Sequence, residues 1–243
     1  MNLESNRTVR ELALDIPGAT RVFEKVGIDY CCGGSNSLES ACAKAGVTVQ
    51  DVRNSLELAK ASDAQTYQPN FVASTLADLI GHIVETHHVF TKSEIERLRL
   101  LIDKVCGAHG QNHPELGTLR SLFETLSSEL EPHMMKEERV LFPYLFQMEN
   151  AVRYNLPVET PPFGRVGNPV RMMMLEHDNA GQLLKELRQV TSDYTVPSDA
   201  CVSYQTLYQA LDEFENDLHQ HIHLENNILF PRAVEMEKKL RGH

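Results

Sequence analysis

Apolar residues recur every three or four positions along four long stretches of this chain, the pattern of amphipathic α-helices that bury one face. The expected helices cover residues 74–105, 115–149, 169–191 and 198–240. In the second stretch the apolar stripe continues into His133 and Glu137, and in the fourth it continues into His221 and Glu225. Histidine and glutamate therefore occupy positions of a buried stripe, where a polar group needs a partner.

The two polar interruptions belong to one motif, HxxxExxxLFP, which occurs at His133–Pro143 and again at His221–Pro231. A histidine and a glutamate four residues apart lie about 40° from one another around a helix, so both side chains reach one point. A further histidine precedes each motif at nearly the same offset, 45 residues for His88 and 44 for His177. The pattern predicts a duplicated helical hairpin and hence an all-α four-helix bundle with four histidines and two glutamates in its core.

The first helix offers two adjacent histidines, and apolar residues lie on both candidate faces. Choosing His87 would make the two offsets differ by two residues, 46 against 44, whereas with His88 they differ by one, so His88 is the predicted ligand. His223 lies about 200° around the helix from His221 and Glu225, so it is expected to face outward. The remaining histidines have no counterpart at the repeat offset and are expected in solvent: His82, His109, His113, His219 and His243.

The first part of the chain carries shorter helical patterns and a cysteine pair. Residues 1–62 are expected to form a small helical domain, 63–73 a polar linker, and 74–243 the bundle. The pair, Cys31 and Cys32, precedes two glycines that let the backbone approach another group closely. Adjacent cysteines do not readily close a relaxed disulfide with each other, so the pair is interpreted as a redox or iron-handling element. Structural roles are expected for Cys42, Cys106 and Cys201.

The charge of the chain argues against several classes of partner. Its formal net charge is -11 and its pI is about 5.4, which disfavours binding to nucleic acid or to an anionic membrane surface. No apolar run approaches the roughly 20 residues of a membrane span, and residues 1–20 lack a signal-peptide pattern. The expected location is the cytoplasm, where the five cysteines stay reduced.

Six polar side chains at one level of a bundle predict a metal site, because two buried glutamates without a cation would each carry a large desolvation cost. The predicted ligands are His88, His133, Glu137, His177, His221 and Glu225. Four imidazoles and two carboxylates suit zinc, iron or manganese. The ligand count favours two ions that share both glutamates, with a bridging oxide or hydroxide as a fifth ligand and an open position for nitric oxide or oxygen. A zinc pair would instead indicate hydrolysis, for which no general base is evident.

Two further glutamates lie close to the predicted ligands. Glu129 precedes His133 by one turn, and Glu176 is adjacent to His177. Each is interpreted as a hydrogen-bond acceptor for a ligand imidazole or as a proton relay. The alternative for each is a solvated surface carboxylate.

At these residues the chain resembles the repair-of-iron-centres family, which are haemerythrin-like di-iron proteins that repair iron-sulfur clusters. The resemblance covers nearly the whole chain and is carried by the segments Asp15–Gly18, Asp29–Gly34, His133–Glu138, Glu176–Asp178 and His221–Pro231. It implies a haemerythrin-like bundle with two non-haem iron ions, a small cysteine-bearing N-terminal domain, and a role under nitric oxide or oxidative stress. Its iron ligands fall on the six residues that the repeat indicates.

Two functions follow as hypotheses. In the first, the protein repairs damaged iron-sulfur proteins by supplying iron, and Cys31 and Cys32 engage the recipient or supply electrons. In the second, the di-iron site binds or reduces nitric oxide, as a sensor or an enzyme. The resemblance favours repair, and so does the cysteine pair, because handing iron to another protein has a use for a mobile, thiol-bearing domain. A homodimer is compatible with either function.

Overall fold

The computed structural model describes residues 7–62 and 71–241, which form helices and one isolated bridge between Thr8 and Ser37. The early part contains α1 (Val9–Asp15), α2 (Ala19–Lys25), α3 (Leu38–Ala45) and α4 (Val49–Ser62). The later part contains α5 (Leu76–His82), η2 (Ile83–His88), α6 (Val89–His109), α7 (Glu115–Lys136), η3 (Glu137–Leu141), α8 (Phe142–Tyr154), α9 (Gly167–Val190), α10 (Val202–Leu224), η4 (Glu225–Leu229) and α11 (Phe230–Arg241). The all-α class predicted from the sequence is confirmed.

Side-chain caps fix the starts of two of the short N-terminal helices. The backbone N–H of Glu11 donates to the Thr8 hydroxyl, and the backbone N–H of Thr8 donates to the Glu11 carboxylate, so α1 begins with a capping box. Ser37 caps α3 by accepting from the backbone N–H of Ser40 at 3.2 Å. Each such cap contributes about 0.5–2 kcal/mol to stability.

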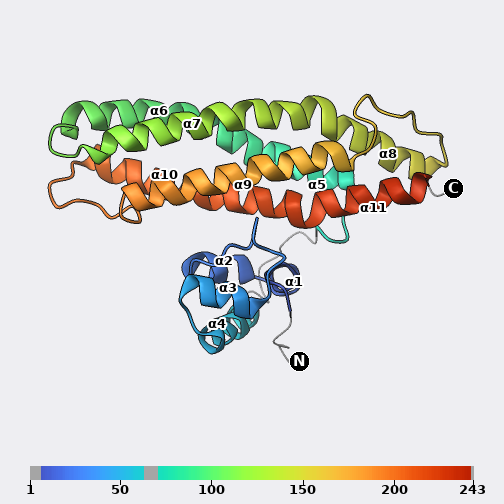
Figure 1. The fold of residues 1–243 in the computed structure, drawn as a ribbon, viewed down its shortest axis with the longest axis horizontal. Coiled ribbons are helices and arrows are strands. Elements are labelled where there is room, and N and C mark those ends of the chain that lie inside the picture. The colour runs from blue at the N-terminus through green and yellow to red at the C-terminus, as the bar shows by residue number, and fades with distance from the viewer. Residues whose placement is uncertain (1–6, 63–70, 242–243) are drawn as a thin grey trace. The chain divides into compact units, whose positions relative to one another are not determined.

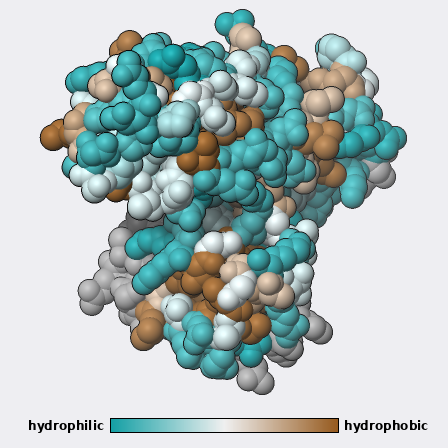
Figure 2. Space-filling model, turned by 60° about the vertical axis from the view of Figure 1, so that its left-hand side comes forward, coloured by the Kyte–Doolittle hydropathy of each residue, from teal (hydrophilic) through white to brown (hydrophobic). Residues whose placement is uncertain are grey.

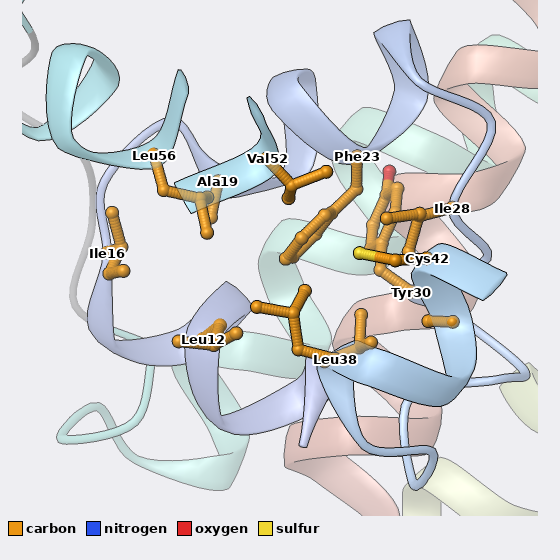
Figure 3. Close-up of a cluster of buried hydrophobic side chains, with 12 residues drawn as sticks. Leu12, Ile16, Ala19, Phe23, Ile28, Tyr30, Leu38, Cys42, Val52 and Leu56 are labelled. Atoms are coloured by element: carbon orange, nitrogen blue, oxygen red, sulfur yellow. The ribbon is translucent and has the colours of Figure 1, made fainter. Parts of the chain in front are cut away.

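The short helices enclose a hydrophobic core of their own (Figure 3). Phe23 of α2 and Leu56 of α4 are fully buried in it, and Leu38 brings α3 into the same cluster. Tyr30, from the loop after α2, is also buried, and its hydroxyl donates to Glu24 at 2.5 Å. This core keeps the loop that carries the cysteine pair attached to packed helices.

Four rods of helix form the bundle: α5 with α6, α7 with α8, α9 alone, and α10 with α11 (Figure 1). Phe123 of α7 packs edge-on against Phe214 of α10, with ring centroids 5.9 Å apart. Arg188 of α9 and the hydroxyl of Tyr194 both donate to the Glu215 carboxylate of α10, each at 2.8 Å. Apolar contacts and a partly buried ion pair therefore join three of the rods.

Three of the four rods contain a short π-helical segment, η2, η3 or η4. Pro143 is the second residue after η3, and Pro231 is the second residue after η4. A proline has no N–H to donate and its ring clashes with the carbonyl four residues earlier, which here is that of Arg139 or Asn227. The wider π turn gives that carbonyl room, so the helix continues past the proline.

The last long helix begins later than the sequence indicated. The predicted start was residue 198, but Ser198 lies in a turn, and α10 begins at Val202. The first helical hydrogen bond runs from the backbone N–H of Tyr204 to the carbonyl of Cys201 at 3.0 Å. Cys201 is therefore the residue directly before the helix.

The described part of the chain divides into two compact units. One contains the residues up to Thr75 together with His219–Arg232, and the other contains Leu76–Leu218 together with the residues from Ala233 onward. Residues 63–70 of the predicted linker lie outside the described residues, so the predicted domain boundaries stay a prediction.

None of the described helices is both long and apolar enough to cross a membrane. The face of the molecule seen in Figure 2 is mainly hydrophilic, with apolar residues in smaller groups between the polar ones. Among the exposed large apolar side chains, Leu100 and Val202 have the highest exposed fractions, 75% and 76%.

Candidate metal centre

The helices bring six donors together in two clusters that share both glutamates. One cluster consists of His88, Glu137, His221 and Glu225, and the other of His133, Glu137, His177 and Glu225. Within each cluster the donor atoms all lie within 4.8 Å of one another, and every side chain is buried. These six are the residues that the repeat predicted as ligands. Each cluster has the donors for one metal ion, and the shared carboxylates join the clusters into a di-metal site.

Pairs of donor atoms are spaced like neighbouring ligands of one ion. Nε2 of His133 lies 3.0 Å from Nε2 of His177 and 3.4 Å from Oε2 of Glu137. Nε2 of His88 lies 3.5 Å from the same Glu137 oxygen. Metal–ligand bonds of about 2.1 Å place adjacent ligands about 3.0 Å apart on an octahedral ion and about 3.4 Å apart on a tetrahedral one. Oε2 of Glu137 therefore faces an imidazole of each cluster, as a bridging carboxylate would.

The Glu137 carboxylate shows most directly that cations fit this site. The residue is fully buried, and neither of its oxygens has a hydrogen-bond donor among the described residues. A buried carboxylate without a donor or a cation is strongly destabilising. The Nε2 atoms of His133 and His177 are 3.0 Å apart. A cation bound by the lone pairs of both nitrogens would stabilise this close approach. The donor set therefore fits a pair of metal ions.

His88 is oriented by a glutamate that the sequence reasoning missed. Nδ1 of His88 lies 2.7 Å from Oε1 of Glu138, and Lys92 donates to the same oxygen at 2.6 Å. Burial alone would raise the pKa of Glu138, but the hydrogen bonds from Lys92 and His88 outweigh burial and lower it. The charged acceptor holds the proton of His88 on Nδ1 and leaves Nε2 for the metal. The available signal was its place directly after a predicted ligand, Glu137.

His133 has a corresponding partner in Glu176. Nδ1 of His133 lies 2.8 Å from Oε2 of Glu176, and Lys136 donates to the other oxygen of that carboxylate. Burial would raise the pKa of Glu176, but hydrogen bonds from Lys136 and His133 lower it. Glu129, the other glutamate predicted to contact a ligand, is exposed, and its side chain makes no hydrogen bond to an imidazole of the described residues. The acceptor comes from α9, across the bundle, and not from the preceding turn of α7.

Substitution of Glu176 by alanine is expected to lower metal affinity about 10–100-fold, because His133 loses the group that fixes its tautomer and ring orientation. Competition with a chromophoric chelator measures the change. Glu129→Ala is the matched control, since it removes a glutamate one turn from His133 that is exposed. Equal affinities of the two variants would contradict the role assigned to Glu176.

Two other histidines on these helices are buried and belong to neither cluster. Nδ1 of His87 lies 2.9 Å from Asp217, which satisfies its ring in the core. The expectation that His223 faces solvent is wrong. It is 5% exposed, its ring lies edge-on to Tyr30 at 5.3 Å, and its Nδ1 is 3.0 Å from the side-chain nitrogen of Asn227. Burial lowers the pKa of His223 to about 4, so the ring is neutral. Other histidines expected in solvent are partly buried, namely His82, His109, His113 and His219, and His243 lies outside the described residues.

The cysteine pair forms a separate group with Asp29. Oδ1 of Asp29 accepts from the backbone N–H groups of Cys32 and Gly33, at 3.0 and 2.9 Å, and so holds the loop in a tight turn. The two sulfur atoms are 3.9 Å apart, and Cys31 is buried whereas Cys32 is half-buried. The hydrogen bond with Cys32 and burial raise the pKa of Cys31 well above its usual value. Cys31 is therefore a thiol at neutral pH, and Cys32 is the more accessible sulfur.

The fold and the site define a class of protein, a four-helix bundle that holds two metal ions between imidazoles and shared carboxylates. Residues 79–233 match the family described as the Hemerythrin HHE cation binding domain. Residues 5–60 match a family described as a Domain of Unknown function (DUF542).

Curated relatives resemble the chain along almost its whole length. A Haemophilus influenzae protein named "Probable iron-sulfur cluster repair protein" is 35% identical over 95% of this chain and 97% of its own. The Escherichia coli "Iron-sulfur cluster repair protein YtfE" is 35% identical over 92% of this chain and 94% of its own. The Pectobacterium carotovorum protein of the same name is 33% identical over 96% and 98%. The chain belongs to this family of haemerythrin-like iron-sulfur cluster repair proteins, and the resemblance found in the sequence is confirmed.

Proposed function

We propose that the two metal ions are iron and that an oxide or hydroxide bridges them. The donors are four imidazoles and two shared carboxylates, and neither cluster includes a thiolate. Imidazole and carboxylate ligands suit iron, and paired glutamates between facing helices are the usual arrangement of di-iron bundles. The names of the relatives, which refer to iron-sulfur clusters, support iron over zinc.

We propose that the protein repairs iron-sulfur clusters by supplying iron to damaged iron-sulfur proteins. The observation that carries this proposal is the shared, thiolate-free donor set of the two clusters. The iron of a cluster is held by cysteine thiolates, which bind it more strongly than oxygen and nitrogen donors do. Iron therefore moves favourably from this bundle to a recipient with vacant cysteines. Damaged iron-sulfur proteins are the expected partners.

The cysteine pair is the proposed point of engagement with the recipient. Cys32 is the accessible sulfur, and the turn held by Asp29 presents it next to Cys31. A thiolate at this place binds iron in passage or supplies electrons to the recipient. Cys32 is the sulfur expected to react first, because it is the more accessible of the two.

A second candidate function is binding or reduction of nitric oxide at the di-metal site. Each cluster offers four protein donors, which leaves positions for small ligands on a six-coordinate ion. This function needs the metal ligands but not the cysteine pair.

One experiment separates the two functions. Iron-loaded protein is incubated with an iron-sulfur enzyme that nitric oxide has damaged, and both the recovered activity and the transfer of isotopically labelled iron are followed. Wild type is expected to restore activity, and His133→Ala is expected to fail because it lacks a metal ligand. The double variant Cys31→Ala/Cys32→Ala is expected to be slower, whereas Cys106→Ser, the matched thiol control, is expected to behave as wild type. Recovery by His133→Ala, or rapid consumption of nitric oxide without recovery, would contradict repair by iron supply.

A further inference from the structure

A second group of metal-ligand residues lies at the end of the bundle where one loop joins α6 to α7 and another joins α9 to α10 (Figure 1). His109 ends α6, His113 lies in the first loop, and Asp199 and Cys201 lie in the second. All four residues belong to the same compact unit. At a rise of about 1.5 Å per residue, His109 is about 30 Å along the helix from His88, so this group is separate from the di-metal centre.

The donor atoms of this group have the spacing of a metal site. One ligand atom each from His109, His113 and Asp199 lies within 4.8 Å of the others. Nε2 of His113 is 3.1 and 3.2 Å from the two oxygens of Asp199, close to the ligand separation of about 3.3 Å on a tetrahedral ion. The backbone N–H of His113 donates to the carbonyl of His109 at 2.9 Å. The turn therefore continues past the end of α6 and keeps both imidazoles on one side.

Neighbouring residues hold both imidazoles in place. Tyr204 is fully buried, and its ring lies edge-on to His109 at 5.3 Å and to His113 at 5.4 Å. On the other side of the His113 ring, Nδ1 lies 2.9 Å from a carboxylate oxygen of Glu115. A carboxylate on one ring nitrogen and a ligand position on the other is the arrangement that Glu176 gives to His133 in the di-metal centre. This second contact leaves Nε2 of His113 directed at the group.

Cys201 follows Asp199 by two residues and is the candidate for a fourth donor. Hydrogen bonding with backbone N–H groups at the start of α10, above all that of Tyr204, and with the His109 imidazole lowers the pKa of Cys201 to about 7. The residue is exposed, so an ion can reach it from solvent. Two imidazoles, one carboxylate and one thiolate are the ligand types of four-coordinate zinc sites.

An ion pair without a metal is the competing explanation. The hydrogen bonds with Glu115 and Asp199 raise the pKa of His113, so a protonated His113 between two carboxylates would also be stable. That account uses His113 alone. It gives no reason for His109 to place a ring nitrogen within 4.8 Å of the donor atoms of His113 and Asp199.

We propose that His109, His113, Asp199 and Cys201 bind one divalent ion of the zinc type, which cross-links the two loops at this end of the bundle. The ion replaces the proton of His113 and adds a bond between segments that are far apart in the sequence. Because it binds the folded chain and not the unfolded one, it raises the unfolding temperature, and the rise increases with the logarithm of the free zinc concentration above the Kd.

The test uses the full chain with its di-metal centre loaded. The protein is dialysed against limiting zinc, and zinc and the resident metal are both measured. Wild type is expected to gain one zinc ion per chain with the resident metal unchanged, and His113→Ala and Asp199→Asn are expected to weaken that uptake at least about tenfold. Asp103→Asn is the control, because it removes one exposed charge from the same end of α6, where Asp103 pairs with Arg120 at 2.8 Å, but no donor of the group.

Cobalt(II) supplies a second readout that folding defects do not imitate. Cobalt in the wild-type site is expected to show a thiolate-to-metal charge-transfer band, and Cys201→Ser is expected to lose that band while it retains the visible bands of four-coordinate cobalt. No zinc uptake by wild type, equal uptake by all variants, or uptake only with loss of the resident metal would overturn the proposal.

Discussion

Replacement of Glu225 by alanine is expected to remove both metal ions, because its carboxylate is a donor in both clusters. Replacement of His177 removes a donor from one cluster only. Metal content after gel filtration is therefore expected to fall from about two ions per chain in wild type to about one in His177→Ala and about none in Glu225→Ala. This difference in stoichiometry follows from sharing of the carboxylate and from nothing else in the site.

Glu213→Ala is the matched control for this series, since Glu213 is a glutamate on α10, about three turns before Glu225, and belongs to neither cluster. It is expected to keep both ions. A Glu225→Ala protein that retains one firmly bound ion would show that the carboxylate serves a single cluster. Equal loss in His177→Ala and Glu225→Ala would show that the two ions bind only as a pair.

The second large effect concerns stability without metal. Removal of the ions leaves the Glu137 carboxylate buried with no hydrogen-bond donor among the described residues. Substitution of Glu137 by leucine is expected to raise the free energy of unfolding of the metal-free protein by about 1–4 kcal/mol, because an apolar side chain carries no such desolvation cost. The same substitution is expected to destabilise the protein in excess metal, since it removes the binding energy that stabilises the wild type.

Denaturant unfolding with and without a chelator measures both halves of this contrast. Glu124→Leu, at an exposed position of α7, is expected to change stability by less than about 0.5 kcal/mol in either condition. A Glu137→Leu protein that is less stable than wild type in the chelator would mean that the metal-free carboxylate has a partner after all.

The core of the site could be predicted because its ligands lie in the apolar stripe of a repeated motif. His133 and Glu137 occupy positions where only apolar residues were expected, and their copies, His221 and Glu225, follow a lone histidine at nearly the same offset. Burial and spacing together identify such positions without coordinates. The choice of His88 over His87 also followed from the repeat, and only His88 lies in a cluster.

Residues that act across helices were harder to predict. Glu138 was missed because the position after a ligand points about 100° away from it on a single helix, and only packing against the rod that contains η2 and α6 brings it to His88. His223 was predicted to face outward, but it is buried and belongs to neither cluster. Its ring is covered by Tyr30, from a segment almost 200 residues earlier, which no periodicity within the helix indicates.

The π segments give the motif of eleven residues at His133–Pro143, and its copy, a second structural role. A π turn holds one more residue than an α turn, so the helix that follows is rotated by about 100° relative to an uninterrupted α-helix. The consecutive residues Leu141 and Phe142 are both buried, as are Leu229 and Phe230. The histidine and glutamate of the motif thus supply metal donors, while its last three residues set the direction in which α8 and α11 face. Insertion or deletion of one residue between the glutamate and the last three residues of the motif would leave the metal donors on the buried stripe. It would turn the helix that follows, α8 or α11, away from its neighbours.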